Sequence, residues 1–443
     1  MDTISLFFHK AVRRNEIDNT LYKTYDVKKG LRNEDGTGVL IGLTQISDVV
    51  GYEKKDGKKV DCPGKLYYRG IDVKEIVNGN KGRRYLFEEV CFLILFGYLP
   101  DIEELEEFKK VLREHYELPT HFLQSNILGL PAKNVMNKLQ QEVLMMYNYD
   151  ESPEDISAAA TLEKGLNLIA KIPSMVCYTY ASKVHYFDNQ SLIVHQINPE
   201  LSIAEMILSL LRPDSSFTPT EAEVLDLCLC LHADHGGGNN STFTSVVISS
   251  TGTDLYSSIA GSIGSLKGPR HGGANLAVRK QMNAVVEKIG TNPTDEKIHE
   301  IVCDILDKKF GDGSGLIYGI GHAVYTLSDP RSEILCSKAF ELARETNRIE
   351  EFEFYQRFAM IASEELSLRK GINVCTNVDF YSGLVYDMLG IPTELFTLLF
   401  VIGRTVGWVA HTIETRLYAD RIIRPASKYV GEITNYTELE KRD

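Results

Sequence analysis

The sequence predicts a mainly α-helical globular protein with a small β region near its N-terminus. Two observations support this. β-branched residues alternate with other residues along residues 35–75, as they do in half-buried strands. After that region, apolar residues recur at spacings of three and four, as on one face of a helix. The composition agrees with a folded protein, because 43% of the residues are hydrophobic and 25% are charged. A chain of 443 residues exceeds what one compact core usually holds, so two domains are expected.

The first elements follow in chain order. The segment TGVLIGLTQISDVVGYE, residues 37–53, predicts a strand, and KKDGKK, residues 54–59, is a turn candidate. LFEEVCFLILFGYLP, residues 86–100, predicts a helix that ends at its proline. DIEELEEFKKVLREHYELP, residues 101–119, predicts another helix that a proline also ends.

A strong start signal marks the next helix, in FTPTEAEVLDLCLCLHADH. Thr218 is expected to be its N-cap, Pro219 its first residue, and Glu221 the partner that completes a capping box. The helix should run to about His232 and bring that residue and His235 to its C-terminal end.

Residues 241–268 are crowded with Ser, Thr, Gly and Ala. Such small side chains let helices approach closely, so a tight helix–helix contact is expected here, within the chain or between subunits. A flexible loop is the alternative, but the apolar residues of this stretch stand at helix-compatible spacings.

Charge and cysteine usage indicate the compartment and exclude some partners. The net charge of −13 and the pI near 5.4 argue against nucleic acid and against an anionic membrane surface, but not against an anionic substrate held by local arginines. The eight cysteines form no CxxC pair, which favours reduced thiols in a cytoplasmic protein. The N-terminus lacks the pattern of a signal peptide. The apolar stretch 90–99 is about half as long as a membrane span requires.

Four stretches combine glycine or apolar neighbours with side chains that can do chemistry. Glycine beside a polar side chain lets a substrate or another backbone come close. Three histidines directly adjoin glycine, namely His235, His271 and His322. The stretches are LHADHGGGNN (231–240), GPRHGGAN (268–275), GIGHAVYTLSDPR (319–331) and NVDFYSG (377–383).

Each stretch also has an ordinary structural explanation. A single histidine beside glycine is commonly a loop residue or a cap, Asp379 could be a helix N-cap, and SDPR could be a turn that starts a helix. HADH offers two histidines, but no third ligand follows at a suitable spacing, so no metal site is predicted. GIGHAV fails the dinucleotide-binding pattern at its last position.

Taken together and in order, these motifs resemble those of the citrate synthase family. The resemblance runs from YYRGIDVKEIV near residue 67 to RIIRPASKYVG, which ends at residue 431. GIGHAVYTLSDPR matches the family signature, and GPRHGGAN, HADH, NVDFYSG and IGRTVGW match further family motifs.

The resemblance implies a two-domain, mostly helical fold. Residues 1–272 and 374–443 would form the large domain, and residues 273–373 an inserted small domain. It also implies that the protein is a homodimer. Its activity would be that of an acyltransferase that forms a C–C bond, with attack on the si face. Acetyl-CoA would condense with oxaloacetate to give citrate and CoA, with the CoA thioester as co-substrate and no permanently bound cofactor.

The resemblance also assigns roles to residues. Asp379 would be the base that deprotonates the thioester methyl group, His271 the donor to the enolate oxygen, and His322 the acid at the oxaloacetate carbonyl. Substrate binding would fall to His235, Arg331 and Arg404, and to Arg424 supplied by the neighbouring subunit.

Three positions depart from the common family pattern, and two alternatives stay open. Thr326 stands where many members carry a basic residue near CoA, Arg270 replaces an apolar residue, and Leu276 replaces Glu or Gln. These changes concern CoA binding rather than the catalytic groups. The alternatives are a 2-methylcitrate synthase that uses propionyl-CoA, with Phe400 near the acyl pocket, and a non-catalytic homologue that only binds metabolites.

Overall fold

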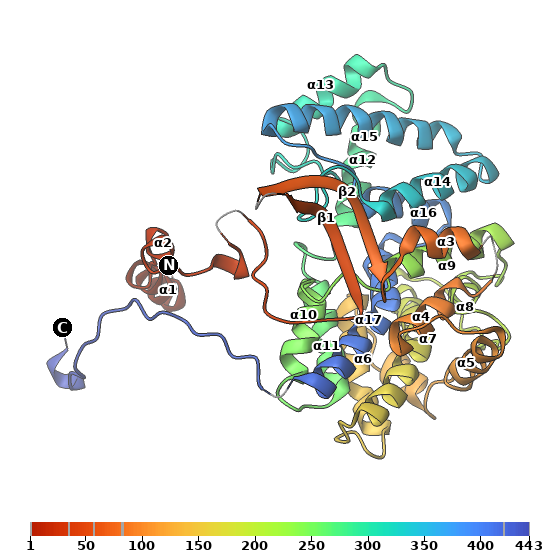
Figure 1. Ribbon diagram of the computed structural model, residues 1–443, viewed down its shortest axis with the longest axis horizontal. Coiled ribbons are helices and arrows are strands. Elements are labelled where there is room, and N and C mark those ends of the chain that lie inside the picture. The colour runs from red at the N-terminus through yellow and green to blue at the C-terminus, as the bar shows by residue number, and fades with distance from the viewer. Residues whose placement is uncertain (1, 34–35, 56–57, 81–83, 420, 443) are drawn as a thin grey trace. The chain divides into compact units, whose positions relative to one another are not determined.

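The computed structural model of the chain describes residues 2–33, 36–55, 58–80, 84–419 and 421–442 (Figure 1). The described chain divides into two units. The first consists of residues up to 43 together with those from 423 onward, and the second of residues 44–422. The predicted boundaries of the small domain, at 273 and 373, lie inside the second unit and stay a prediction.

The first unit contains short helices and extended segments. They are α1 (Thr3–Arg14), α2 (Thr20–Thr24), η1 (Lys29–Leu31) and η5 (Leu439–Lys441). None of these helices has a buried residue. Asp2 caps α1, because its carboxylate accepts a hydrogen bond from the Ser5 amide at 2.7 Å.

The second unit holds one antiparallel sheet and most of the helices. The sheet has the order β1 (Ser47–Lys55), β2 (Lys58–Tyr68) and β3 (Ile71–Asp72), with an irregularity between Val50 and Tyr52. The helices are α3 (Val73–Asn80), α4 (Leu86–Phe96), α5 (Ile102–Glu114), α6 (Val135–Met146), α7 (Ala158–Asp188), α8 (Ile203–Leu211), α9 (Pro219–His232), α10 (Asn240–Ser249), α11 (Leu255–Leu266), α12 (Ala274–Ile289), α13 (Asp295–Leu306), α14 (Pro330–Glu345), α15 (Ile349–Lys370), α16 (Val378–Met388) and α17 (Phe396–Tyr418), with helical turns η2 (Leu123–Leu128), η3 (Tyr147–Tyr149) and η4 (Thr393–Leu395).

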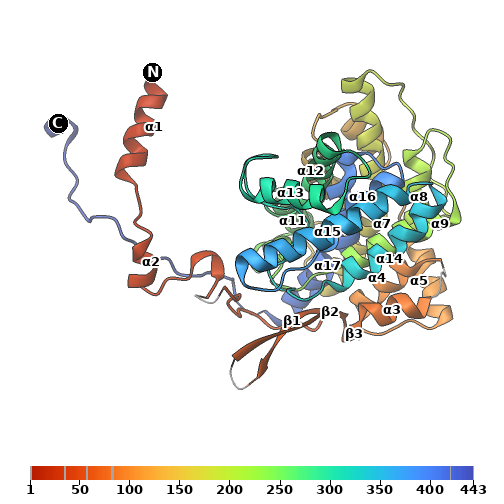
Figure 2. The ribbon, with the colours of Figure 1, turned by 90° about the horizontal axis from the view of Figure 1, so that it is seen from above.

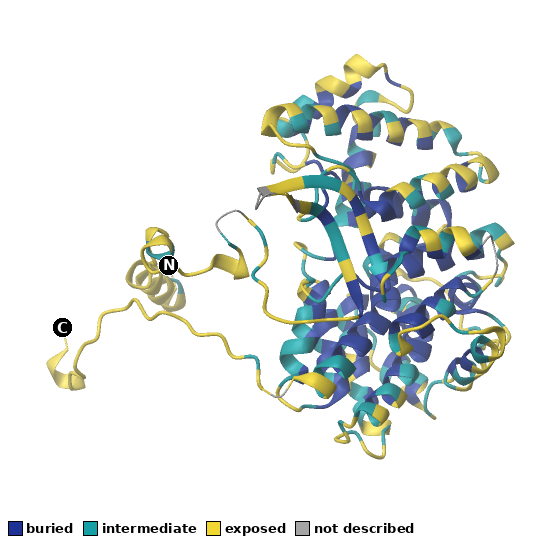
Figure 3. Ribbon diagram, in the orientation of Figure 1, coloured by how far each residue is buried: buried dark blue, intermediate teal, exposed yellow. Residues whose placement is uncertain are grey.

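Helix α17 forms the centre of the core of this unit. It is buried from Phe396 to Thr412 except at Thr397, and this part of its ribbon is dark blue in Figure 3. Its 26-residue helical region, Thr393–Tyr418, is long and apolar enough to cross a membrane. However, 89% of the most apolar window is buried inside the protein, as is usual for the core helix of a soluble fold.

The sheet packs against the loop that carries His322. A side chain at Gly51 would overlap the backbone of Val324, and one at Gly64 would overlap Ser328. The Gly64 amide donates to Ser328 Oγ at 3.2 Å, and Tyr325 donates its hydroxyl to the Lys65 carbonyl at 3.3 Å. The two glycines of the sheet therefore allow the His322 loop to lie directly on the strands.

Helices α12–α15 gather at one end of the second unit, away from α6 and α11 (Figure 1). Seen from above, α13 and α15 again lie side by side (Figure 2). These four helices fall within the stretch that the resemblance assigns to a small domain.

The mainly helical prediction with a minor N-terminal sheet is confirmed. The capping box of α9 is also confirmed, because Thr218 Oγ1 accepts from the Glu221 amide at 3.2 Å and Glu221 Oε2 accepts from the Thr218 amide at 2.7 Å. The small-residue stretch forms α10 and α11, in close contact as predicted. Ser262 Oγ donates to the Ser241 carbonyl at 2.8 Å, and a side chain at Gly261 would overlap Ile248.

Three predicted boundaries are wrong. The strand starts at Ser47 rather than near residue 37, because the apolar residues of the preceding segment are largely exposed: Leu40 is 96% and Leu43 is 99% exposed. Helix α4 ends at Phe96, since Gly97 adopts a left-handed φ of 89°. Helix α5 ends at Glu114, well before Pro119. The predicted turn at KKDGKK includes Asp56 and Gly57, which lie outside the described residues.

Candidate active site

Two glycines bring the His322 loop against the start of α16. Gly319 and Gly321 have φ values of 76° and 98°, which only glycine adopts readily. A side chain at Gly319 would come within 2.9 Å of Phe380 Cα. The Asn377 amide donates to the Gly319 carbonyl at 2.9 Å, and Asn377 Nδ2 donates to the Gly321 carbonyl at 2.8 Å. Two of the sequence motifs, 319–331 and 377–383, thus form one continuous structure.

His322 is held as a neutral hydrogen-bond donor. Its Nδ1 lies 3.1 Å from the backbone amides of both Val324 and Tyr325. An amide can only donate, so Nδ1 is the acceptor and the ring proton is on Nε2. The ring stacks on Tyr325 with centroids 4.7 Å apart. Burial, followed by the nearby charge of Arg331, lowers the pKa of His322 to about 4.

His271 has the opposite tautomer. The Ser241 amide donates to His271 Nε2 at 3.3 Å, which leaves the proton on Nδ1. Ser241 Oγ lies 3.2 Å from the same nitrogen, and Trp408 donates its indole N–H to that hydroxyl at 3.3 Å. Burial and then the charge of Arg404 lower the pKa of His271 to about 4. The imidazole is therefore neutral at neutral pH and can donate from Nδ1.

Asp379 occupies the first turn of α16 but does not cap it. Asn377 is the N-cap, and its side-chain oxygen accepts from the Asp379 amide at 3.0 Å. The interpretation of Asp379 as a helix cap is therefore wrong, and its carboxylate is left for another role. Burial raises the pKa of Asp379 to about 6, against the opposing charges of Arg331 and Arg404.

Two buried arginines add positive charge around this carboxylate. Arg331 Nε and Nη2 donate to the two oxygens of Asp329 at 3.0 and 2.8 Å, which leaves Nη1 outside this pair. Asp329 also caps α14, so the interpretation of SDPR as a helix start is confirmed. Arg404 Nε donates to the His232 carbonyl at 2.6 Å. Both arginines are only 3% exposed.

His235 completes the group, in the loop between α9 and α10. Its ring lies 5.2 Å from that of His322, edge to face. Its Nε2 is buried and has no hydrogen-bond partner among the described residues. A buried polar atom left unsatisfied within the protein is costly, so this nitrogen is a natural contact for a ligand. Burial and the charge of Arg331 hold the pKa of His235 well below its usual range.

Asp234 fixes the backbone next to His235, and the sequence reasoning did not identify this residue. Its carboxylate accepts from Ser47 Oγ and lies 3.2 Å from His411 Nε2. The Gly236 amide donates to Ser47 Oγ at 3.0 Å. The position of Asp234 between the two histidines of HADH was the available signal. Its partners are 187 and 177 residues away, so the sequence pattern did not reveal them.

Six of the seven predicted site residues belong to this one group. Their charges affect one another's pKa values: His235 responds to Arg331, His322, Arg404 and His271, and Asp379 responds to both arginines. The seventh, Arg424, is exposed and belongs to the first unit, so its place at the site stays a prediction.

Phe400 stacks on His232 with centroids 3.6 Å apart, and Tyr386 Oη lies 2.5 Å from His232 Nε2.

The group can bind an anion and move a proton. Two guanidinium groups attract carboxylates, neutral imidazoles donate hydrogen bonds without adding positive charge, and a carboxylate with a raised pKa accepts a proton.

Three residues depart from the common family pattern. Arg270 is exposed, Leu276 is half-buried, and Thr326 Oγ1 is buried without a partner in the described chain. None of them belongs to this group.

Comparison with known proteins agrees with the motifs. The family model of the citrate synthase C-terminal domain matches residues 33–426. A citrate synthase of Haloferax volcanii is 33% identical over 425 residues, which cover 94% of this chain and 99% of that protein. A 2-methylcitrate synthase of Shewanella oneidensis is also 33% identical, over 83% of this chain and 88% of that protein. The crystal structure of citrate synthase from Pyrobaculum aerophilum superposes with a TM-score of 0.74 at 32% identity, over 91% of this chain and 94% of that one. The chain therefore belongs to the citrate synthase family.

Proposed function

We propose that this chain condenses acetyl-CoA with oxaloacetate and hydrolyses the resulting thioester to citrate and CoA. One observation supports this above all: a carboxylate with a raised pKa stands among neutral imidazole donors and two buried arginines. A thioester methyl group is a weak carbon acid, so its deprotonation requires both a base and a donor to the developing enolate oxygen.

Oxaloacetate binds first in this proposal. Arg331 Nη1 and the terminal nitrogens of Arg404 bind its carboxylates, and His235 Nε2 makes a further hydrogen bond. Asp329 keeps the Arg331 fork in place, because it holds two of the guanidinium nitrogens. The electrostatic match is with a small dianion, despite the net charge of −13 for the whole chain.

Condensation then uses three groups in one step. Asp379 takes a proton from the acetyl methyl group while His271 Nδ1–H stabilises the enolate oxygen. The methyl carbon attacks the carbonyl carbon of oxaloacetate, and His322 gives its Nε2 proton to the carbonyl oxygen. The proton that Asp379 took then returns to His322 through water, so both groups regain their starting state. Water then cleaves the thioester, which releases citrate and CoA. Both histidines act as neutral donors, in agreement with their lowered pKa values.

The proposal extends to assembly and movement. The chain acts as a homodimer in the cytoplasm, with Arg424 of one subunit reaching the site of the other. Residues 273–373 form a small domain that closes over oxaloacetate, builds the acetyl-CoA site and keeps water from the thioester before condensation.

The alternative function is that of a 2-methylcitrate synthase. The relative of Shewanella oneidensis carries that name at the same identity as the first citrate synthase. One methylene in an apolar pocket changes binding by only about 1–3 kcal/mol, so the same catalytic residues serve either substrate. A non-catalytic homologue is disfavoured, because the base, both histidine donors and both core arginines are present.

The deciding experiment measures thiol release from acetyl-CoA and propionyl-CoA, each with and without oxaloacetate. Faster oxaloacetate-dependent release from acetyl-CoA supports the proposal, and faster release from propionyl-CoA supports the alternative. Release from neither substrate, with tight oxaloacetate binding by calorimetry, would indicate the non-catalytic homologue.

The role of Asp379 is tested by Asp379→Asn in the same assay. Loss of a general base lowers kcat by about 10²–10⁴-fold. Oxaloacetate binding should be kept or tightened, because the substitution removes a negative charge beside the two arginines. Asp188→Asn, at an exposed carboxylate, is the matched control and should keep wild-type turnover. Wild-type turnover in Asp379→Asn would refute the assignment.

A further inference from the structure

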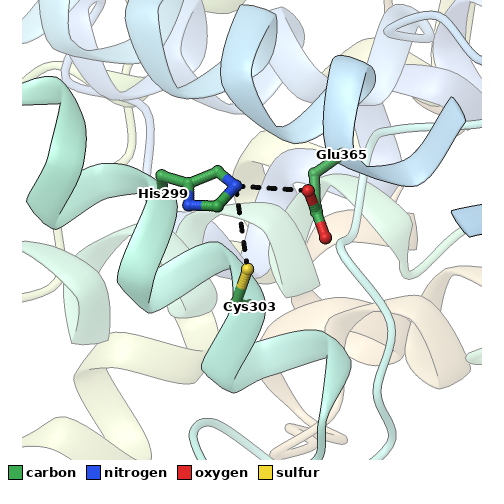
Figure 4. Close-up of side chains that lie close together, drawn as sticks. All are labelled: His299, Cys303 and Glu365. Carbon is green, nitrogen blue, oxygen red and sulfur yellow. Dashed lines mark hydrogen bonds and ion pairs between the residues drawn. The ribbon is translucent and has the colours of Figure 1, made fainter. Parts of the chain in front are cut away.

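A second group of chemically reactive side chains lies on α13 and α15 (Figure 4). His299 and Cys303 are four residues apart on α13 and therefore share one face of that helix. Glu365 approaches them from α15, and its Oε2 lies 3.2 Å from His299 Nε2. Cys303 Sγ lies 3.9 Å from the same nitrogen. The three ligand atoms all lie within 4.8 Å of one another.

This spacing is close to that of a metal site. Bonds of about 2.0–2.3 Å in a tetrahedron place neighbouring ligand atoms about 3.3–3.8 Å apart. Two of the three separations, 3.2 and 3.9 Å, are close to this range, and the third is at most 4.8 Å, so a metal ion would be reached by side-chain adjustments. Imidazole nitrogen, cysteine sulfur and carboxylate oxygen are the three ligand types that zinc accepts, and three protein ligands leave the fourth position for water.

The surroundings favour a cation. A cavity of about 430 Å³ adjoins His299 and is lined by several carboxylates, those of Asp295, Glu296, Glu300, Glu364 and Glu365. Arg357 pairs with Asp295 and Arg369 with Glu365, each at 2.7 Å, so two of the five carboxylates are offset by arginines. The remaining negative charge raises the local concentration of cations.

Arg369 has a dual effect on the group. Its guanidinium donates to Glu365 Oε1 at 2.7 Å, which fixes the carboxylate and leaves Oε2 directed at His299. Metal ligands commonly have such a second hydrogen-bond partner. The positive charge of Arg369 disfavours the binding of a cation, but Asp307 pairs with Arg369 at 2.7 Å and reduces that effect.

We propose that His299, Cys303 and Glu365 bind a divalent cation of the zinc class, with water as the fourth ligand. The site joins α13 to α15, shares no residue with the group around Asp379, and does not depend on the proposed reaction. Its effect is to crosslink two helices within the stretch 273–373.

The test uses the full-length protein without a polyhistidine tag, stripped with a chelator and desalted. Zn²⁺ is titrated against a coloured competing chelator, and Co²⁺ serves as a spectroscopic probe of cysteine ligation. One equivalent of Zn²⁺ per chain is expected, together with a thiolate-to-cobalt charge-transfer band. Cys303→Ser should abolish that band, and His299→Ala and Glu365→Gln should each weaken Zn²⁺ binding at least tenfold. Cys336→Ser, at another half-buried cysteine, should leave both unchanged.

Thermal unfolding with and without Zn²⁺ checks that the variants are folded. The His299 side chain is 54% exposed, so His299→Ala should fold normally and lose only the Zn²⁺-dependent rise in melting temperature. The proposal is wrong if the wild-type protein binds less than one equivalent. It is also wrong if the cobalt band survives Cys303→Ser, or if His299→Ala binds Zn²⁺ as tightly as the wild type.

Discussion

At the scale of single residues, the site depends on which nitrogen of each histidine carries the proton. Backbone amides determine this, since they donate to Nδ1 of His322 and to Nε2 of His271. Each ring then has one proton left to give, and burial among arginines keeps both rings neutral. An imidazolium would repel the arginines and would have no need of a particular tautomer.

The activity should depend on the protonation of Asp379. The pKa of this carboxyl is raised to about 6, and only its ionised form accepts a proton. We therefore expect kcat/KM for acetyl-CoA to fall about tenfold for each pH unit below about 6. The two histidines, with pKa values of about 4, stay neutral over most of that range. A pH–rate profile at saturating oxaloacetate measures this, and a flat profile down to pH of about 4.5 would contradict the role of Asp379.

The same carboxyl should lower the stability of the protein at neutral pH. Its pKa is about 3.8 in the unfolded chain and about 6 in the folded protein, so the folded state binds a proton that the unfolded state releases. Proton binding by Asp379 therefore stabilises the folded state. This contribution is complete below a pH of about 3.8 and is lost as the pH rises through about 6. Asp379→Asn should therefore raise the free energy of unfolding relative to wild type by about 2–3 kcal/mol at pH 8, and less as the pH falls.

Denaturant unfolding of the two proteins at several pH values measures this difference. Asp188→Asn provides the control and should show no gain that depends on pH in this way. A difference between Asp379→Asn and wild type that is constant from pH of about 4 to 8 would mean that the carboxyl is not desolvated in the folded protein.

At the scale of elements, one helix supports several parts of the site. Arg404, Trp408 and His411 stand at spacings of four and three along α17, on one face of the helix. They contact the His232 carbonyl, Ser241 and Asp234 respectively. The central core helix therefore determines the positions of α9, α10 and the HADH loop relative to one another.

This arrangement requires glycine at position 407. A side chain there would lie 2.6 Å from the Ala233 carbonyl and would overlap the Asp234 carboxylate. Gly407→Ala should lower the free energy of unfolding by about 1–3 kcal/mol, as overpacking does, and should weaken oxaloacetate binding because the His235 loop is displaced. Gly79→Ala, where the added Cβ would meet no atom of the described residues within 4 Å outside its own helix, should do neither. Denaturant unfolding and calorimetric titration test both variants, and equal stability of Gly407→Ala and wild type would refute the packing argument.

The elements also show what sequence alone could predict. The start of α9 could be predicted because Thr218, Pro219 and Glu221 act within a single turn. The start of β1 could not be predicted, because alternating apolar residues form a strand only where another part of the protein covers their apolar face. The motifs of the candidate site were recognisable because glycine and polar residues adjoin in the chain. The contact of Asp234 with His411 could not be recognised in the sequence, because only the folded core brings α17 against the end of α9.

At the scale of the whole molecule, the first unit carries much exposed apolar surface. Phe7 and Phe8 are more than 60% exposed, and Ile433 and Tyr436 more than 80%. Side chains of this kind are normally covered by a partner when they cluster. This surface supports the proposal of a homodimer, in which segments of one subunit, including Arg424, serve the other. Analytical ultracentrifugation should then give twice the chain mass of 49.8 kDa.

Mixed dimers can decide whether Arg424 acts across the subunit boundary. Arg424→Leu and Asp379→Asn, each in its own homodimer, should both have strongly reduced activity. Co-expression with two affinity tags isolates the mixed dimer. If Arg424 serves the partner's site, one of its two sites combines an intact Asp379 from one chain with an intact Arg424 from the other. The mixed dimer should then recover about half of the wild-type activity. If Arg424 serves its own chain, every site lacks one of the two groups, so activity no higher than that of Arg424→Leu would refute the shared site.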